Sequence, residues 1–384
     1  MVLPTGCYRA DHVGSLLRPK PLLEARQKWA QGSLPAEELR QLEDKYIADV
    51  VQKELDAGLR SITDGEFRRA YFHLDYLKHL DGVEVQGFMN STSSSTEGAE
   101  KFGPPKLIVS GKLAHPKAIQ VDDFNFLEKQ IAKDGQTKKA TTKVCIPSPT
   151  MVHFRGGREN ISKEAYPTLE PFFEDLARVY QEELDDLYKA GCRFVQLDDT
   201  NLAYLCDPAM RKEAAERHGQ DPQEIANHYA ELINKAISKR PKDLAIGIHL
   251  CRGNHRSKWF AQGGYEPVAE VLFKKLNVDV YFLEFDDARS GDFSPLRHLP
   301  DHKVVVLGVM TSKVGKLDDK EAMKSRLNEA AKFCPKGLDQ LCVSHQCGFS
   351  SVQEGNELTE EEQWAKIRLS VEIAKELWGD DLSQ

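Results

Sequence analysis

From about residue 139 onward, short runs of apolar and β-branched residues alternate with longer amphipathic stretches. The apolar runs are TTKVCI, CRFVQL, LAIGIHL, VDVYFLEF, KVVVLGVM and QLCVSH. Between them, apolar residues recur every three or four positions, as in helices, near 169–190, 222–239, 266–276, 319–332 and 358–378. Strands that alternate with helices in this way are typical of parallel sheets with crossover helices.

The first part of the chain supplies two further strands, near Tyr8 to Val13 and at LRSIT (59–63). The stretch EELRQLEDKYIADVVQKELDAGL, which precedes LRSIT, predicts a helix, and Gly58 suits its C-terminal cap. Its apolar face carries Leu42, Tyr46, Val50 and Leu55. Eight strands with intervening helices predict an α/β fold, a single (β/α)8 TIM barrel over residues 1–384. A doubly wound open sheet is the alternative.

Residues 83–138 interrupt the alternation between the second and third predicted strands. NSTSSSTEG is a polar, Ser-rich loop, and the flanking KLIVSGKLAH and FNFLEKQIAK indicate a hairpin and a helix. We expect an insertion that covers the barrel mouth as a lid. A surface loop without function is the alternative, since long loops are found in both roles.

Composition narrows the class of protein. A length of 384 residues suits a barrel with an insertion, and a formal net charge of -8 argues against nucleic acid as a partner. No signal segment and no run of about 20 apolar residues is present, so we expect a cytoplasmic protein without a membrane partner. Eight cysteines spread over this length do not resemble a disulfide framework. The sequence does not indicate an oligomeric state.

Polar residues follow each predicted strand. In a parallel barrel, the carboxyl ends of the strands meet at one mouth and supply the catalytic residues. The segments at these ends are Gly14–Ser15, Asp64–Glu66, Pro147–Ser148, Asp198–Asp199, His249–Cys251, Glu284–Asp286, Thr311–Lys313 and His345–Cys347. The sequence therefore predicts one polar site at this mouth.

His249 and Cys251 lie two positions apart on an extended segment, so their side chains point the same way and can share an ion. Glu284 and Cys347, at the ends of later strands, would complete a tetrahedron. One nitrogen, two thiolates and a carboxylate suit zinc. Cys342 competes with Cys347 but lies within an apolar run. Four other cysteines are expected to be buried apolar residues: Cys145, Cys192, Cys206 and Cys334.

Several stretches together resemble the cobalamin-independent methionine synthase superfamily, specifically its catalytic zinc barrel and the shorter single-barrel relatives. They are HVGSLLRP (12–19), TDGEFRR (63–69), VQLDD (195–199), HLCRGN (249–254), LEFDD (283–287) and HQCGFSS (345–351). The resemblance runs over nearly the whole chain.

The resemblance implies the same zinc ligands: His249, Cys251, Glu284 and Cys347. It further implies that an amino-acid thiol substrate is held by a main-chain and Ser contact at Val13 and Ser15. Glu66 and Asp198 would bind its ammonium group. The alternative for these two carboxylates is a salt bridge at the barrel rim with Arg68, Arg69 or Lys313.

The chain departs from the full-length synthase in two ways. It begins almost at once with the catalytic barrel, where the synthase carries a second, amino-terminal one. Where the synthase has an Asp-x-His element after the seventh strand, with His as proton donor, this sequence has GVMTSK at 308–313. Because a tertiary amine leaves poorly unless it is protonated, Lys313 or His345 would have to substitute, or the alkyl donor differs.

The segment HLCRGNHRS is more similar to the single-barrel relatives, some of which use other alkyl donors. Arg252, Asn254 and Arg256 are candidates for binding an anionic part of a ligand. The alternative is ion pairing at the rim with Asp286, Asp287 or Asp292.

The sequence thus predicts a zinc-dependent enzyme that transfers a methyl or other alkyl group to a homocysteine-like thiol. Methyltetrahydrofolate is the first candidate for the donor. The candidate catalytic residues are Glu66, Asp198 and Lys313, and the donor is expected near Pro147, Trp259 and the insertion. A different thiol or a non-folate donor, a zinc hydrolase and an inactive ligand-binding barrel remain alternatives.

Overall fold

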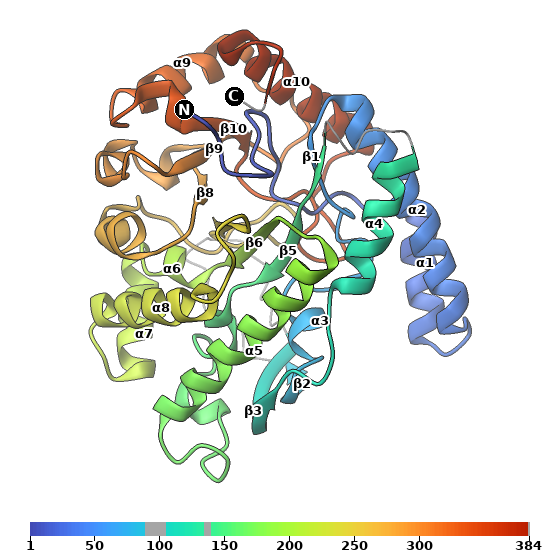
Figure 1. The fold of residues 1–384 in the computed structure, drawn as a ribbon, viewed down its shortest axis with the longest axis vertical. Helices are drawn as coiled ribbons and strands as arrows, with labels where there is room; N and C mark the ends of the chain where they lie inside the picture. The colour runs from blue at the N-terminus through green and yellow to red at the C-terminus, as the bar shows by residue number, and fades with distance from the viewer. Residues whose placement is uncertain (89–104, 134–139, 383–384) are drawn as a thin grey trace.

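Six parallel strands form the main sheet, in the order in which they occur along the chain (Figure 1). They are β5 (Val144–Pro147), β6 (Phe194–Asp199), β7 (Ala245–Leu250), β8 (Val280–Glu284), β9 (Val304–Met310) and β10 (Leu341–His345). The computed structural model describes residues 1–88, 105–133 and 140–382. Since each strand pairs with the next along the chain, the sheet curls in one direction, as in a (β/α)8 barrel.

The N-terminal part of the chain closes this sheet into a barrel. β1 (Ser61–Ile62) pairs in parallel with β4 (Thr141–Thr142), which leads into β5. At the other edge, Ala10 forms a parallel bridge to Val343 of β10. The predicted barrel is therefore confirmed, and the open doubly wound sheet is wrong.

The segment predicted as the first strand, residues 8–13, joins the ladder only at this bridge. Beyond it, side chains make the connection to β1, because the His12 Nε2 atom lies 3.1 Å from the Ser61 carbonyl oxygen. The Thr63 hydroxyl donates to the Gly14 carbonyl at 2.7 Å. Hydrogen bonds of buried polar side chains thus replace the backbone hydrogen bonds of a strand ladder here.

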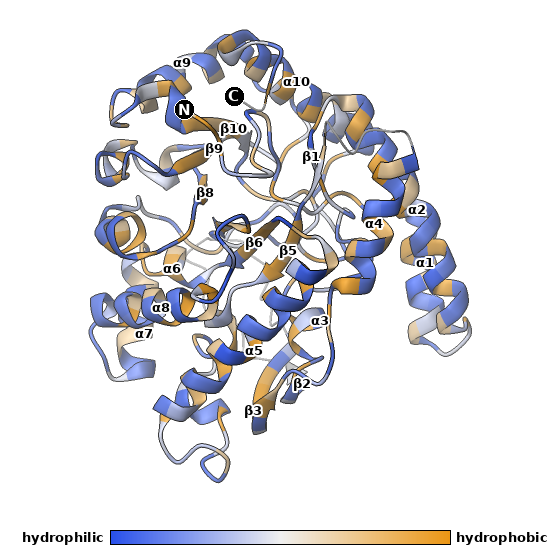
Figure 2. Ribbon diagram, in the orientation of Figure 1, coloured by the Kyte–Doolittle hydropathy of each residue, from blue (hydrophilic) through white to orange (hydrophobic). Residues whose placement is uncertain are grey.

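The helices surround the sheet, and Figure 1 shows them on the outside of the strands. They are α1 (Lys20–Ala30), α2 (Ala36–Ala57), α3 (Leu74–Leu77), α4 (Val121–Lys133), α5 (Leu169–Ala190), α6 (Asn201–Tyr204), α7 (Pro208–His218), α8 (Pro222–Ile237), α9 (Lys320–Ala331) and α10 (Glu360–Trp378). Gly58 ends α2 with a φ of 95°, as its position predicts. Figure 2 shows the apolar residues concentrated on the strands and on the inner helix faces.

The helix expected over 266–276 is present but irregular, because most of it is not α-helical. Glu266–Val268 is a 3₁₀ turn, and Val271–Lys275 is a π-helical turn. The Tyr281 hydroxyl donates to the Leu272 carbonyl at 2.6 Å, so that this carbonyl has a side-chain partner inside the turn. Inserted side chains of this kind widen the helical spacing locally.

The inserted segment contains the hairpin and the helix that its sequence indicates. β2 (Asp81–Phe88) pairs antiparallel with β3 (Pro105–Ala114), and α4 follows. The hairpin is tied to the barrel by an Asn160 amide that donates to the Leu107 carbonyl at 3.1 Å. The stretch NSTSSSTEG lies outside the described residues. A lid function for 83–138 stays a prediction.

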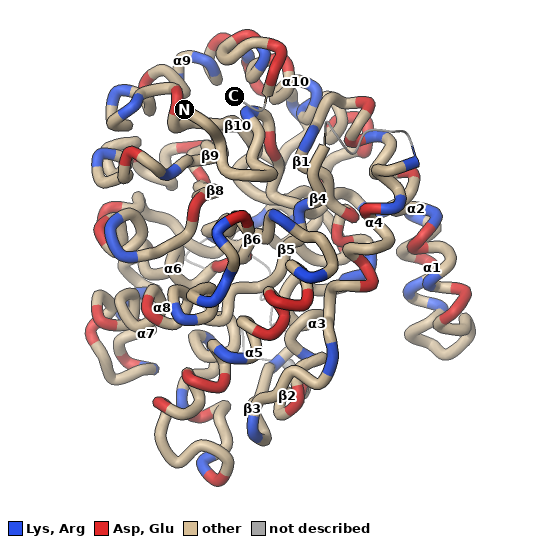
Figure 3. Tube along the Cα trace, in the orientation of Figure 1, with Lys and Arg blue, Asp and Glu red and all other residues tan. Residues whose placement is uncertain are grey.

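Charges of both signs alternate over the outer helices (Figure 3). None of the helices in the described part of the chain combines the length and the apolar character needed to span a bilayer.

Candidate metal centre and central cavity

Four side chains that can bind a metal meet at the carboxyl ends of the strands. The metal cluster consists of His249, Cys251, Glu284 and Cys347, and their donor atoms all lie within 4.8 Å of one another. The Sγ atoms of Cys251 and Cys347 are 3.4 Å apart. Two sulfurs that bind one zinc at about 2.3 Å each cannot be more than about 4.6 Å apart, and this pair meets that limit.

The His249 ring is oriented for a metal. Its Nδ1 atom lies 3.3 Å from the Phe282 carbonyl oxygen, to which it can donate a proton. Its Nε2 atom is buried and has no hydrogen-bond partner. A histidine that donates through one nitrogen to a carbonyl presents a lone pair on the other, which is the usual state of a metal ligand. The residues therefore fit a zinc ion.

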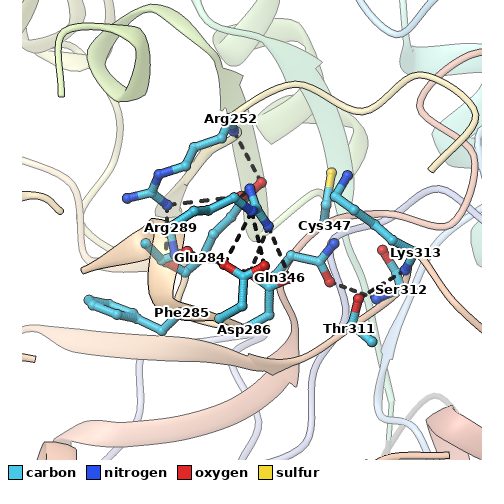
Figure 4. Close-up of polar contacts among 12 residues, drawn as sticks. Arg252, Glu284, Phe285, Asp286, Arg289, Thr311, Ser312, Lys313, Gln346 and Cys347 are labelled. Atoms are coloured by element: carbon cyan, nitrogen blue, oxygen red, sulfur yellow. Dashed lines mark hydrogen bonds and ion pairs between the residues drawn. The ribbon is translucent and has the colours of Figure 1, made fainter. Parts of the chain in front are cut away.

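Glu284 is completely buried and is held by two arginines (Figure 4). Its Oε1 accepts from the Arg252 backbone amide at 3.1 Å, and its Oε2 lies 3.5 Å from an Arg289 nitrogen. Burial raises the pKa of the Glu284 carboxyl, Cys347 raises it further, and the arginines counteract both. The arginines thus orient the carboxylate and supply charge that offsets the anionic sulfurs.

Among the buried cysteines whose pKa departs from its usual value, Cys347 has the lowest pKa. Its contact with Cys251 lowers the pKa of Cys347 well below the usual value, against the effect of burial, and His249 and Lys313 lower it further. The pKa of His249 is raised: burial alone would lower it, but the Cys347 sulfur and nearby carboxylates outweigh burial. The cluster therefore favours a thiolate before any metal is bound.

A backbone irregularity carries Cys347 into the cluster. The pairing of β10 with β9 shifts register between Ser344 and His345, and the Gln346 amide then donates to the Met310 carbonyl at 2.9 Å. Gly308 makes room for this bulge, because a Cβ there would lie 2.5 Å from the Gln346 Cα. The bulge re-aims the residues that follow it.

A cavity adjoins the cluster and encloses about 650 Å³, part of it open to solvent. It is lined by His249, Cys251 and Cys347, and by five residues that the sequence assigned to substrate: Val13, Ser15, Glu66, Asp198 and Asn254. We call it the central cavity. Glu284, the fourth residue of the metal cluster, is not part of the cavity lining. The fold therefore brings the predicted metal and thiol sites together.

Glu66 and Asp198 face the central cavity beside the cluster. β6 and β7 are in register with Asp198 opposite His249, which fixes the carboxylate next to this ligand. Burial raises the pKa of Glu66 to about 8 and that of Asp198 to about 6, and the nearby Asp198 charge adds to the rise at Glu66. A cation bound between them would relieve this repulsion.

The salt bridge at the barrel rim that was the alternative role for Glu66 is long. Arg69 lies 3.7 Å from the Glu66 Oε2, which has no hydrogen-bond partner. Arg68 instead pairs with Asp44 at 2.6 Å. Asp198 accepts from the Gln196 amide at 2.7 Å.

Ser15 is held in place by the segment that follows β10. Its Oγ accepts from the Ser350 amide at 3.3 Å, and Gly348 packs against it so closely that a Cβ at 348 would lie 1.9 Å from this oxygen. The Val13 carbonyl accepts from the Gln196 side chain at 2.6 Å.

Two predicted site residues do not line the central cavity. The Arg252 side chain is fully buried and donates to the Gly263 carbonyl at 2.8 Å and to Tyr265 at 2.9 Å. It also donates to the Glu284 carbonyl at 3.0 Å, so that most of its donors are bonded within the protein, and a substrate-binding role for Arg252 stays a prediction. Lys313 donates to the Asn254 Oδ1 at 2.9 Å, and this bond keeps it outside the lining while its charge acts on Cys347.

Other residues expected at the rim and in the donor pocket lie outside the lining of the central cavity. Arg256 pairs with Glu357 at 3.4 Å. Pro147, Trp259 and His345 are absent from the lining of the central cavity. Trp259 is instead covered by the Arg289 guanidinium, 5.3 Å from its ring centroid.

The remaining part of the cavity wall was not predicted. It consists of Tyr71, Phe72, His73, Arg155, Tyr204 and Phe260. These residues lie in loops and short helices between the strands, where no apolar run precedes them to mark their position. His73 is 6 % exposed, and its Nδ1 has no hydrogen-bond partner.

The cysteines outside the cluster are buried, as expected. Cys342 lies 3.9 Å from Cys7 in a separate apolar cluster, which excludes it from the metal cluster. Cys145 lies near Glu66 and Asp198, with ligand atoms within 4.8 Å of one another.

Comparison with known proteins gives a consistent result. The family described as "Cobalamin-independent synthase, Catalytic domain" matches residues 10–376. The uncharacterized protein YxjH of Bacillus subtilis is 44 % identical over 376 residues, which cover 97 % of this chain and 95 % of that protein.

Solved structures with the same fold include a candidate vitamin-B12-independent methionine synthase from Listeria monocytogenes. It is 37 % identical with a TM-score of 0.77, and 99 % of each chain is covered. A B12-independent methionine synthase from Shewanella sp. W3-18-1, solved in complex with selenomethionine, has a TM-score of 0.72 at 20 % identity, with 98 % of each chain covered. The second likeness extends to the fold alone.

Proposed function

Since the chain belongs to the family of cobalamin-independent synthase catalytic domains, we propose that it transfers a methyl or other alkyl group to the sulfur of a homocysteine-like amino-acid thiol. The observation that carries the proposal is the junction of the metal cluster with a pair of buried carboxylates in one cavity. A thiol that also bears an ammonium group matches this pair of sites.

We propose zinc as the metal, held by the four residues of the metal cluster. A zinc ion held there would lower the pKa of a bound thiol and so favour its nucleophilic thiolate form at neutral pH. The two cysteine sulfurs keep the site anionic, which preserves the nucleophilicity of a substrate sulfur. Arg289 and Arg252 limit this negative charge by binding Glu284.

The protein positions the substrate through three contacts. Glu66 and Asp198 bind the ammonium group, and their mutual repulsion falls when the cation arrives. The Ser15 hydroxyl donates to the substrate carboxylate. Orientation by several fixed groups brings the sulfur and the alkyl carbon into reacting geometry, which lowers the entropic cost of the reaction.

The alkyl donor is proposed to bind against the aromatic wall of Tyr71, Phe72, Tyr204 and Phe260. A flat donor ring can stack on such a surface. Methyltetrahydrofolate is the first candidate, but neither Lys313 nor His345 lines the cavity to protonate its leaving nitrogen. This favours a donor whose leaving group needs no proton as the second candidate.

X-ray absorption at the zinc edge tests the proposed thiol step. Addition of homocysteine to the zinc-loaded protein is expected to raise the number of sulfur neighbours of zinc from two to three. An unchanged zinc shell would exclude the transferase, and turnover without any thiol would instead identify a zinc hydrolase. A shell that gains sulfur, with no alkylated product from any donor, would identify a ligand-binding barrel.

A further inference from the structure

A second cavity lies between α7, α8 and the start of α5, and it shares no residue with the lining of the central cavity. It encloses about 440 Å³, part of it open to solvent. Its ionisable lining is basic except for one tyrosine: His153, Arg158, Arg217, His218 and His228. No Asp or Glu is among the described residues that line it. We call it the basic cavity.

His153 forms the inner wall of the basic cavity and has an unused polar atom. Its side chain is 6 % exposed, its Nδ1 lies 2.9 Å from the Tyr229 hydroxyl, and its Nε2 has no hydrogen-bond partner. Burial, His218 and Arg158 lower the pKa of His153 to about 3, so the ring is neutral. When Tyr229 donates to Nδ1, the ring proton lies on Nε2 and has no acceptor within the protein.

Two further basic groups are fixed by the backbone. Arg158 donates to the Ile161 carbonyl at 3.0 Å and to the Tyr166 carbonyl at 2.6 Å, which places its charge without neutralising it. The His218 Nε2 lies 3.0 Å from the Phe154 carbonyl oxygen. These contacts hold the wall rigid.

The other basic groups lie at the open side. Arg217 is near the end of α7, and Glu213, one turn earlier, is 3.8 Å from its guanidinium. His228 is exposed on α8. Leu169, the first residue of α5, also lines the cavity, so the N-terminal end of a 22-residue helix adds partial positive charge.

We propose that the basic cavity binds an anionic group with phosphate or carboxylate chemistry. Such a group would accept from Arg217 at the open side and from the His153 Nε2, which has no hydrogen-bond partner in the protein. The apolar residues Phe173 and Ile225 line the same cavity and suit a compact ligand with a carbon skeleton. The methyl transfer proposed above uses none of these residues.

A short stretch of chain separates the two cavities. Arg155 lines the central cavity, whereas His153 and Arg158 line the basic cavity. The anion therefore has two possible sources. It is either a free small molecule or an anionic extension of the ligand in the central cavity, such as the glutamate tail of a folate. Only the second source rests on the proposed function.

Isothermal titration calorimetry of the zinc-loaded, full-length protein tests this proposal without any need for turnover. The probes are inorganic phosphate and the tripeptide tri-γ-glutamate. The test variant is the double substitution Arg217→Gln, His228→Gln. Lys212→Gln is the matched control, because this exposed lysine lies on α7 outside the cavity lining.

We expect saturable binding of one anion, weakened about tenfold or more in the double variant and unchanged in the control. Tighter binding of phosphate identifies a free anion as the ligand, and tighter binding of tri-γ-glutamate identifies the tail of a larger ligand. No saturable binding of either probe, or binding that the double variant leaves unchanged, overturns the proposal. Because this readout needs neither a thiol substrate nor turnover, its failure is distinct from failure of the proposed function.

Discussion

Glu66 has a backbone conformation that few non-glycine residues adopt. Its φ is 60°, directly after Gly65 at 64°. The strained turn is held by two local contacts, since the Thr63 hydroxyl accepts from the Gly65 amide and the Asp64 carboxylate from the Glu66 amide. A conformation of this kind costs about 1–3 kcal/mol and persists where the surroundings require it. Here it points a carboxylate at the central cavity.

Substitution of this residue tests the proposed ammonium site. We expect Glu66→Gln to raise the KM for homocysteine about 10- to 100-fold with little change in kcat, because a charge-assisted contact to substrate is lost. Steady-state kinetics measure this effect. The matched control is 4-mercaptobutyrate, which lacks the amino group and should show an unchanged KM. An equal rise for both thiols would show that Glu66 acts on something other than the ammonium group.

Removal of a single sulfur tests the metal cluster. Cys347→Ala is expected to lower bound zinc from about one equivalent to nearly none, because the loss of one of four protein ligands greatly weakens zinc binding. Metal analysis after dialysis measures this, and circular dichroism should show that the barrel still folds. The variant Cys334→Ala, which removes a buried cysteine outside the metal cluster, should keep its zinc. Full zinc in the Cys347 variant would contradict the ligand assignment.

At the scale of elements, a buried carboxylate of α5 holds the segment that leads into α4. The carboxylate of Glu183 accepts from the amides of Ile119 and Gln120, each at 2.8 Å. The same carboxylate lies 2.6 Å from the His115 Nε2. One buried side chain of α5 thereby fixes the end of the hairpin and the start of α4.

We expect Glu183→Gln to destabilise the protein by about 2–3 kcal/mol, because an amide group cannot accept from all three donors and carries no charge. Urea denaturation measures the change. Glu182→Gln is the control on the same helix, since its exposed pair with Arg178 contributes little. Equal stability of the two variants would mean that Glu183 does not anchor α4.

His115 gives this contact a pH dependence. Its hydrogen bond to Glu183 raises the pKa of His115. The stabilisation is therefore complete below the unfolded pKa of about 6.5 and is lost as the pH rises through the raised folded value. The difference in Tm between the wild type and His115→Asn should be largest in mild acid and shrink toward alkaline pH. A difference that grows with pH would contradict the pairing.

For the whole molecule, the closure of the barrel depends on a buried ion pair as much as on strands. The Lys143 Nζ lies 2.7 Å from the Asp11 carboxylate, and both side chains are 0 % exposed. Lys143 also donates to the His12 carbonyl. This pair joins the N-terminal segment, which has a single backbone bridge, to the start of β5. The two ends of the barrel sheet meet there.

We expect Lys143→Met to destabilise the fold by about 3–5 kcal/mol, because Asp11 would remain buried without its cation. The added substitution Asp11→Asn should restore part of the loss. Urea midpoints measure both, with the exposed Lys129→Met as a control. A destabilisation no greater than that of the control would show that the barrel closes without this pair.

The sequence by itself determined the barrel, because the alternation of apolar runs with amphipathic helices leaves few ways to bury both faces of a parallel sheet. It also determined the metal cluster and the facing carboxylates, since these residues directly follow strands and their place at the mouth is a consequence of strand direction. The tertiary structure alone decided that Arg252 binds Gly263 and Tyr265, and that Tyr71, His73 and Arg155 line the central cavity. It alone assembled the basic cavity from three helices and a loop. Loops carry no periodic pattern that would mark their residues in the sequence. Whether a side chain near a site takes part in it depends on packing and on which hydrogen-bond partners its neighbours offer, and both are set by the tertiary structure.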